Sequence, residues 1–145
     1  MSTSNAWWVY GSEFQIGDGG GTEVFTKVAE VQDIDGPSVT RDSIEVTSQD
    51  STLGWREKIS GWRDADTVTV TANWLPTNAT QDGTTGMWSH FNDDDNHNYR
   101  IVLPTAIGLT IALCGHITGF PVSLPLEEQA QVEFEITLSG PVTIS

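Results

Sequence analysis

The strongest constraint on the fold is a two-residue alternation of apolar and polar side chains that recurs along the chain. It is clearest at 67–74, TVTVTANW, where Val68, Val70 and Ala72 alternate with threonines. Comparable runs are YRIVLP at 99–104, LTIALCGHITGF at 109–120 and VEFEITLSG at 132–140. Successive side chains of a strand point to opposite faces, so each run predicts a strand with one buried face. The β-branched residues and the turn residues between runs predict a mainly β protein, an antiparallel sandwich or barrel.

One flanking helix is predicted beside the strands. A loose apolar stripe at helical spacing is formed by Ala79, Met87, Trp88 and Phe91, and Asn78 or Thr80 can cap the start of the helix. The glycines between the cap and the stripe weaken the helix, so it depends on packing against a sheet.

A long loop is predicted between the second and third main strands, at residues 48–65. The segment is too polar and too long for a tight hairpin, and long loops in compact domains are usually functional or disordered. Trp55 and Trp62 argue against disorder, because exposed indoles commonly anchor interfaces.

The length of 145 residues predicts one folded domain preceded by an arm. Residues 1–22 are predicted to form an aromatic N-terminal arm that ends in the glycine-rich hinge GDGGG, and residues 23–145 the β-sandwich domain. The N-terminus lacks the basic and apolar regions of a secretory signal, and the longest apolar run is too short to cross a bilayer. No membrane insertion is therefore expected.

The charge balance excludes functions that require a grip on phosphates. Twenty acidic residues outweigh six basic ones, giving a formal net charge of −14. Such a surface repels nucleic acid and anionic membranes. Half of the basic residues, Arg56, Lys58 and Arg63, lie within GWREKISGWRD, which suggests a patch that docks on an acidic surface. The alternative is a set of solvated salt bridges, each worth about 0–1 kcal/mol.

The acidic corner FNDDDNHNYRIVLP, at 91–104, has the residue types of a metal or hydrolytic site but not the spacing. A calcium loop that begins at Asp93 needs glycine at its sixth position and glutamate at its twelfth, where this chain has Asn98 and Pro104. His90 and His97 lack a third zinc ligand at a recognisable spacing. A solvated turn is favoured, because Asp and Asn bond to the local backbone. No catalytic residue, metal or cofactor is predicted.

A resemblance to a known family emerges from residues 24–144. The family pattern is a strand that ends in a Gly–Pro break, then T-x-D-x-I-[DE]-V-T-S, then a loop with G-W-R-E before the next strand. The matching residues here are Thr40, Asp42, Ile44, Glu45, Val46, Thr47 and Ser48, then Gly54, Trp55, Arg56, Glu57, Ile59 and Gly61. In these motifs the chain resembles the tail tube proteins, or major tail proteins, of long, non-contractile-tailed bacteriophages.

The resemblance implies a structural, non-enzymatic virion protein that assembles in the host cytoplasm. It implies six-fold rings of self-copies, stacked into a hollow acidic tube that double-stranded DNA crosses without sequence-specific binding. The other implied partners are a tape measure protein and tail tip and terminator proteins. The expected inter-ring or inter-subunit contacts are Trp55, Arg56, Lys58, Trp62 and Arg63. Asp93, Asp94 and Asp95 are expected at the channel or on the outer surface.

Three other functions stay open from the sequence. An inner tube protein of a contractile tail or of a type VI-like secretion system would share the ring architecture. A carbohydrate-binding β-sandwich would use some of the six tryptophans. A hydrolase built on His90, Asp93 and Asp95 is the third, and loss of activity on chelation would support it.

Overall fold

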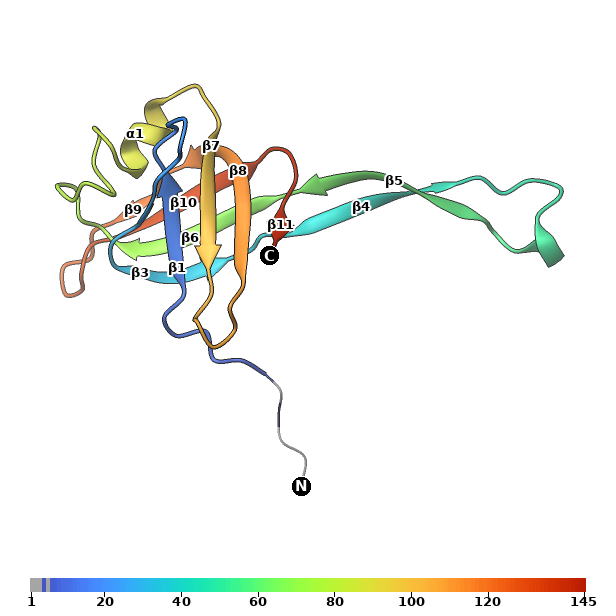
Figure 1. The fold of residues 1–145 in the computed structure, drawn as a ribbon, viewed down its shortest axis with the longest axis horizontal. Helices are drawn as coiled ribbons and strands as arrows, with labels where there is room; N and C mark the ends of the chain where they lie inside the picture. The colour runs from blue at the N-terminus through green and yellow to red at the C-terminus, as the bar shows by residue number, and fades with distance from the viewer. Residues whose placement is uncertain (1–3, 5) are drawn as a thin grey trace.

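The computed structural model describes residue 4 and residues 6–145, and it is dominated by one antiparallel sheet and a projecting hairpin (Figure 1). The strands are β1 (Glu13–Gly17), β2 (Phe25–Lys27), β3 (Val31–Asp35), β4 (Val39–Glu45), β5 (Lys58–Ala65), β6 (Thr67–Asn73), β7 (His97–Val102), β8 (Thr110–Gly119), β9 (Val122–Ser123), β10 (Gln131–Leu138) and β11 (Thr143–Ile144). A short 3₁₀ turn, η1 (Thr52–Gly54), and one helix, α1 (Met87–Asn92), complete the described elements. The prediction of a mainly β protein with one flanking helix is confirmed.

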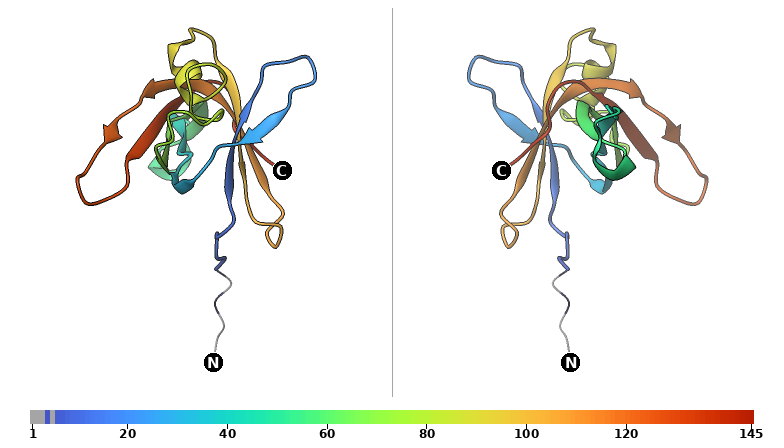
Figure 2. Two further views of the ribbon diagram at one scale, coloured as in Figure 1. Left: turned by 90° about the vertical axis from the view of Figure 1, so that its left-hand side faces the viewer. Right: turned by 90° about the vertical axis from the view of Figure 1, so that its right-hand side faces the viewer.

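The main sheet is curled so that its two halves cover a common core. Its strand order is β2-β1-β7-β8-β10-β6-β3, with β11 added to β8 and β9 added to β10. In Figure 1 the strands β1, β7 and β8 run across β3, β6 and β10, and Figure 2 shows the curl from the side. Phe14 and Tyr99 enter the core from one half, and Val70 and Phe134 from the other, all fully buried. The architecture is therefore the sandwich that the alternating pattern predicted.

The strand β8 joins the two halves because it belongs to both. Its first part, Thr110 to Gly115, pairs with β7, and its last part, Gly115 to Gly119, pairs with β10. At Gly115 the backbones approach so closely that a Cβ atom would collide with the carbonyl oxygen of Thr137. A glycine is therefore required where β8 passes from one half of the sheet to the other.

The helix begins later than predicted, and this part of the prediction is wrong. α1 starts after Gly86, so Asn78 and Thr80 lie in an irregular loop rather than at a helix cap. The Asp82 carboxylate accepts hydrogen bonds from the backbone N–H groups of Thr84, Thr85 and Gly86, which favours a turn over helix. Among the described residues, no helix has the length and apolar character needed to cross a membrane.

The same loop is fixed to the sheet by a buried glutamine. Gln81 donates hydrogen bonds to the carbonyl oxygens of Ala29 and Asn73, and its own side-chain oxygen accepts one from the N–H of Leu75. These bonds satisfy three backbone groups that the irregular loop would otherwise leave without partners. The glutamine thus holds in place a segment that has no regular structure.

Part of the segment predicted as an N-terminal arm, residues 1–22, belongs to the main sheet. Residues 13–17 form β1, which lies between β2 and β7, and Phe14 is fully buried. The glycine cluster forms the β1–β2 turn, in which Asp18 accepts hydrogen bonds from the N–H groups of Gly20 and Val24. Because β1 has only five residues and runs into a glycine tract, its alternation was too short to identify it as a strand. A separate arm before Glu13 stays a prediction.

We predict that Gly115→Ala destabilises the protein by about 2–3 kcal/mol, because the added methyl group forces β8 and β10 apart. Urea unfolding of the dilute protein measures the effect. Gly21→Ala is the matched control, since nothing lies within 4 Å of a Cβ atom placed there. Equal stability of the two variants would contradict the close approach.

Candidate assembly interface

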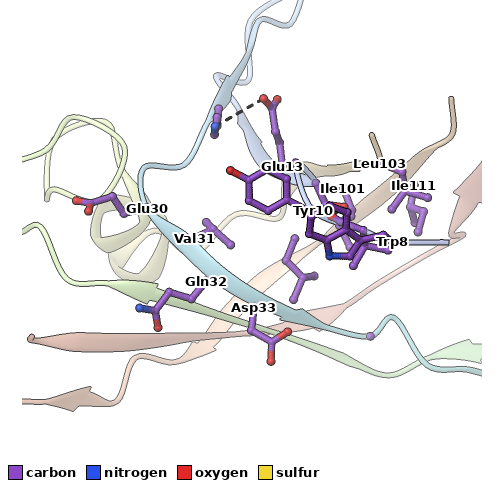
Figure 3. Close-up of a pocket in the computed structure, with 16 residues that line it drawn as sticks. Trp8, Tyr10, Glu13, Glu30, Val31, Gln32, Asp33, Ile101, Leu103 and Ile111 are labelled. Atoms are coloured by element: carbon purple, nitrogen blue, oxygen red, sulfur yellow. Dashed lines mark hydrogen bonds and ion pairs between the residues drawn. The ribbon is translucent and has the colours of Figure 1, made fainter. Parts of the chain in front are cut away.

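A groove on the body is lined by segments that are distant in the sequence. It lies between residues 8–13, β3 and the adjoining ends of β7 and β8, and its volume is about 650 Å³ (Figure 3). Ile101, Leu103 and Ile111 are among its apolar lining residues. Trp8 and Tyr10 form one wall, with ring centroids 5.3 Å apart and both rings largely exposed to solvent.

Acidic side chains surround this groove. Glu13, Glu30 and Asp33 belong to its lining together with one cation, Lys27. Lys27 forms an exposed ion pair with Glu13 at 3.7 Å. Asp33 forms no ion pair with any described residue. The groove could not be recognised from the sequence, because only the folded sheet brings its residues together.

The second surface is a hairpin, residues 39–65, that extends away from the body (Figure 1). Within the described residues, its strands β4 and β5 pair only with each other. The predicted loop at residues 48–65 is therefore wrong in its second half, since Lys58–Ala65 is a strand. The alternation fails here because almost every side chain is exposed, so neither face selects apolar residues.

A β-bulge sits in the shaft of the hairpin. Arg41 pairs with Arg63 but Ser43 pairs with Ser60, so β5 contains one residue more than β4 at this point. The extra residue places Gly61 and its neighbour Trp62 opposite Asp42. A Cβ atom at Gly61 would lie 3.0 Å from the Asp42 Cβ, so the glycine permits the close packing. Bulges twist a ribbon and redirect its side chains.

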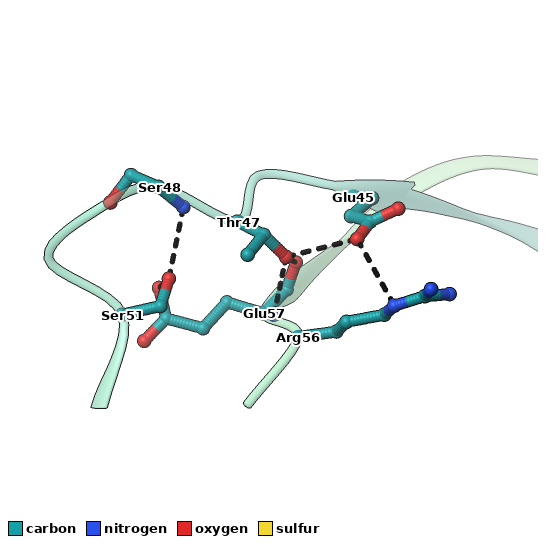
Figure 4. Close-up of polar contacts among 6 residues, drawn as sticks. All are labelled: Glu45, Thr47, Ser48, Ser51, Arg56 and Glu57. Carbon is teal, nitrogen blue, oxygen red and sulfur yellow. Dashed lines mark hydrogen bonds and ion pairs between the residues drawn. The ribbon is translucent and has the colours of Figure 1, made fainter. Parts of the chain in front are cut away.

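Polar side chains build the tip of the hairpin (Figure 4). The Thr47 hydroxyl donates to a Glu45 carboxylate oxygen at 3.0 Å and accepts from the Glu57 N–H at 2.9 Å. The Ser51 hydroxyl donates to the Glu57 carboxylate and accepts from the Ser48 N–H. Beyond these bonds Leu53, with a left-handed φ of 54° and 90% exposed, lies at the end of the structure. The tip is ordered without burying apolar side chains of its own.

The residues expected at inter-subunit contacts all lie on this hairpin, in two groups. Trp55, Arg56 and Lys58 are near the tip, and Trp62 and Arg63 are in the shaft. The indoles of Trp55 and Trp62 are 72% and 84% exposed. Their role in contacts between subunits stays a prediction.

The arginines of the hairpin form few stabilising contacts with opposite charges of the same molecule. Arg56 pairs with Glu45 at 3.8 Å, but both side chains are largely exposed, so this pair adds little stability. Arg63 lies directly across the ladder from Arg41, and like charges in this arrangement repel. The contribution of Arg41 was missed from the sequence, because only the strand register reveals the pairing. An acidic partner would relieve this repulsion.

Apolar side chains are also left uncovered along the hairpin. The exposed large ones are Val39, Ile44, Val46, Leu53, Trp55, Ile59 and Trp62. A two-stranded hairpin on its own is marginally stable in water, and exposed apolar patches of this kind mark contacts with other molecules. The hairpin therefore has the properties of a surface that is covered on assembly.

The acidic corner is a turn between α1 and β7, as predicted. The Asp93 carboxylate accepts the N–H of Asp95 at 3.0 Å. This bond, with the nearby His97 imidazole, holds the pKa of Asp93 below its usual range, and Asp94 and Asp95 are exposed to solvent. The direction that the corner faces in an assembly stays a prediction.

A buried histidine lies behind this corner. His90 is 8% exposed, its Nδ1 is 3.2 Å from the Tyr99 hydroxyl, and its ring stacks on that of His97 at 3.9 Å. Burial, and then the neighbouring His97, lower the pKa of His90 to about 4. His90 is thus a packed, neutral side chain near pH 7. In the described part of the chain, no three His, Cys, Asp or Glu side chains are arranged to hold a metal ion.

The fold is similar to those of several solved phage tail and injection-system proteins. The tail of an empty gene transfer agent particle, with C6 symmetry, superposes with a TM-score of 0.70 at 20% identity, covering 92% of this chain and 94% of that one. The sheath/tube terminator of an extracellular contractile injection system gives 0.72 at 16% identity, covering 99% of both chains. The SPP1 tail tube gives 0.60 at 12%, covering 92% and 75%. The TM-scores show that the folds are similar, and at such low sequence identity they show similarity of fold alone.

The family follows from the sequence itself. The lambda phage tail tube protein family, TTP, matches residues 8–145, and the chain belongs to this family. No curated protein matches the chain. The chain is therefore a structural protein of a phage tail tube, and the resemblance found in the sequence is confirmed.

We predict that the buried His90 makes the protein less stable in mild acid. The unfolded chain takes up a proton near pH 6.5, whereas the folded chain takes it up only near pH 4. The stabilisation is complete above pH 6.5 and is lost as the pH falls through the folded pKa. It amounts to roughly 3 kcal/mol at most.

Urea unfolding of the native protein and of His90→Gln, at about pH 7.5 and about pH 5, tests this. The carboxylates are common to both proteins, so the difference between their pH dependences isolates His90. We expect the free energy of unfolding to fall less between these two pH values in His90→Gln than in the native protein. An identical loss in both proteins would exclude His90 as the cause.

Proposed function

We propose that copies of this chain form six-fold rings that stack into a hollow tube, with the hairpin joining each ring to the next. The observation that carries the proposal is the hairpin itself, which leaves the body and exposes two indoles and four cations. The C6 symmetry of the similar gene transfer agent tail supports six copies per ring. The proposed contacts are Trp55, Arg56, Lys58, Trp62 and Arg63.

The distribution of charge supports contact between the hairpin and the body of another copy. The hairpin contains four of the six basic residues and five of the twenty acidic ones. The rest of the chain therefore has two basic and fifteen acidic residues and carries nearly all of the net charge of −14. Attraction between a nearly neutral, cation-bearing element and a strongly acidic body favours contact between different copies.

The acidic body also suits a channel for DNA. A like-charged wall cannot release counterions from a duplex, so the electrostatic term that makes DNA adhere is absent. We assign Asp93, Asp94 and Asp95 to the channel or to the outer surface of the tube. The tube would hold a tape measure protein during assembly in the host cytoplasm and end at tip and terminator proteins. In this proposal the protein has no enzymatic activity, cofactor or membrane-inserted state.

A second candidate is an inner tube of a contractile system. The similarity to a contractile injection system sheath/tube terminator favours it, because the superposition covers 99% of both chains. The two candidates differ in their surroundings: an inner tube is enclosed by a sheath, and a tube of a non-contractile tail is not. Electron microscopy of complete particles distinguishes them, and the family match favours the non-contractile tail.

We predict that Arg56→Glu leaves the subunit folded but impairs tube formation, because it places a negative charge against an acidic partner. Negative-stain microscopy of the concentrated protein measures tubes, and circular dichroism with urea unfolding checks the fold. Arg56→Lys keeps the charge and should still form tubes. Tubes of normal length and number from Arg56→Glu would overturn the role of the hairpin.

A further inference from the structure

The groove of the body and the tip of the hairpin are complementary in chemistry. The groove combines an apolar floor with the exposed rings of Trp8 and Tyr10 and an acidic rim. The tip combines exposed apolar side chains, Leu53 and Trp55, with the exposed Arg56, which follows Trp55 in the chain. A cavity of about 650 Å³ is in the range that holds a small ligand or a few side chains.

The two cations outside the hairpin are less suited than those of the hairpin to pair with the acidic rim of the groove. All six basic residues are among those described. Lys27 is already paired with Glu13, and the Arg100 guanidinium lies 3.7 Å from the centroid of the Phe25 ring. The remaining four cations are on the hairpin. The hairpin is therefore the richest source of cations for Asp33, and Arg56 would exchange its exposed pair with Glu45, which adds little stability, for one with Asp33.

The hairpin of the same molecule does not meet the groove. Figure 1 shows the hairpin extending away from the body, while the groove lies between the N-terminal segment and β3. Contact between the two surfaces thus requires two copies of the chain.

We propose that the groove of one copy receives the hairpin tip of a second copy. Leu53 and Trp55 enter the groove against its apolar floor and against Trp8 and Tyr10, and Arg56 pairs with Asp33 on the rim. The inference rests on the proposed function of the hairpin and adds the receiving site. Indoles that enter an apolar groove beside a charged pair are typical anchors of protein interfaces.

The contact also accounts for the aromatic residues that precede β1. Trp8 and Tyr10 stack on each other but remain largely exposed in the single subunit. A docked tip buries them, together with its own Leu53 and Trp55. A single contact therefore covers the exposed rings of the groove, Trp8 and Tyr10, and the exposed indole of the tip, Trp55.

A charge exchange tests the pairing of Arg56 with Asp33. Asp33→Lys alone should reduce the mass of tubes that can be pelleted by about tenfold, and so should Arg56→Glu. The double variant Arg56→Glu/Asp33→Lys restores opposite charges at every contact and should recover most of the tubes. Arg56→Glu/Glu128→Lys is the control, because Glu128 is an exposed acid outside the groove and should not restore them.

The outcomes separate this inference from the proposed function. If Arg56→Glu prevents tubes but Asp33→Lys does not, and the double variant fails, the groove is not the receiving site and the hairpin keeps its role. If Arg56→Glu alone forms normal tubes, the proposed function of the hairpin fails. Equal recovery with Asp33→Lys and Glu128→Lys would mean that only net charge matters, and would also overturn the specific pairing.

Cross-linking identifies the occupant independently of charge. Differently tagged subunits, one with Leu53→Cys and one with Gln32→Cys, are mixed under oxidising conditions, with the half-buried Cys114 replaced by serine in both. We expect a disulfide between the two tags, because Gln32 lines the groove. Leu53→Cys with Glu128→Cys should give none. Absence of the first cross-link in assembled tubes, or equal yield in both pairs, would exclude the tip as the occupant.

Discussion

The close approach of β8 and β10 at Gly115 is the contact on which the rest of the structure depends. It allows one strand to pair with β7 over its first part and with β10 over its last, so a single sheet curls and encloses its own core. The same curl positions β3 and β6 side by side at one margin. The hairpin then leaves from this margin, since β4 follows β3 and β5 precedes β6 almost without interruption. A rigid core ladder therefore supports an element that has no core of its own.

The two candidate surfaces are built by different physical means. The hairpin tip is fixed by hydrogen bonds among Thr47, Ser51, Glu45 and Glu57, which leaves its apolar side chains free for a partner. The groove is fixed by the curl of the sheet, which brings the segment before β1 next to β3 and to the β7–β8 pair. Neither surface requires a bound ion or a reactive side chain, which is in keeping with a structural protein.

The sequence predicted those parts of the fold in which one face is buried. β6 and β10 alternate between core and surface, so Val68, Val70, Phe134 and Ile136 were recognisable as core positions. Lys58–Ala65 was not recognisable as a strand, because both of its faces meet solvent in the single subunit. The helix start was misplaced because the bonds of Asp82 stabilise a turn that residue propensities do not reveal.

The residues of the candidate site were also only partly predictable from the sequence. The segment GWREKISGWRD at residues 54–64 is local, so it was enough to indicate three of the hairpin cations and both indoles. Arg41 and the groove residues remained hidden, since they depend on the ladder register and on segments that only the folded sheet brings together. Local sequence therefore identified what the hairpin offers to a partner, and only the folded sheet revealed a surface that could receive it.

Each subunit has the hairpin of residues 39–65 on one side only, so any stack built through this hairpin has two different ends. Contacts in which one copy donates an element and the next accepts it do not close on themselves along the stacking direction. At one terminus of such a polymer every hairpin projects without a partner, and at the other every receiving surface is empty. If rings join through the hairpin as proposed, the proteins at the two ends of the tube differ: one supplies an acceptor for indoles and arginines, and the other supplies a substitute for the hairpin.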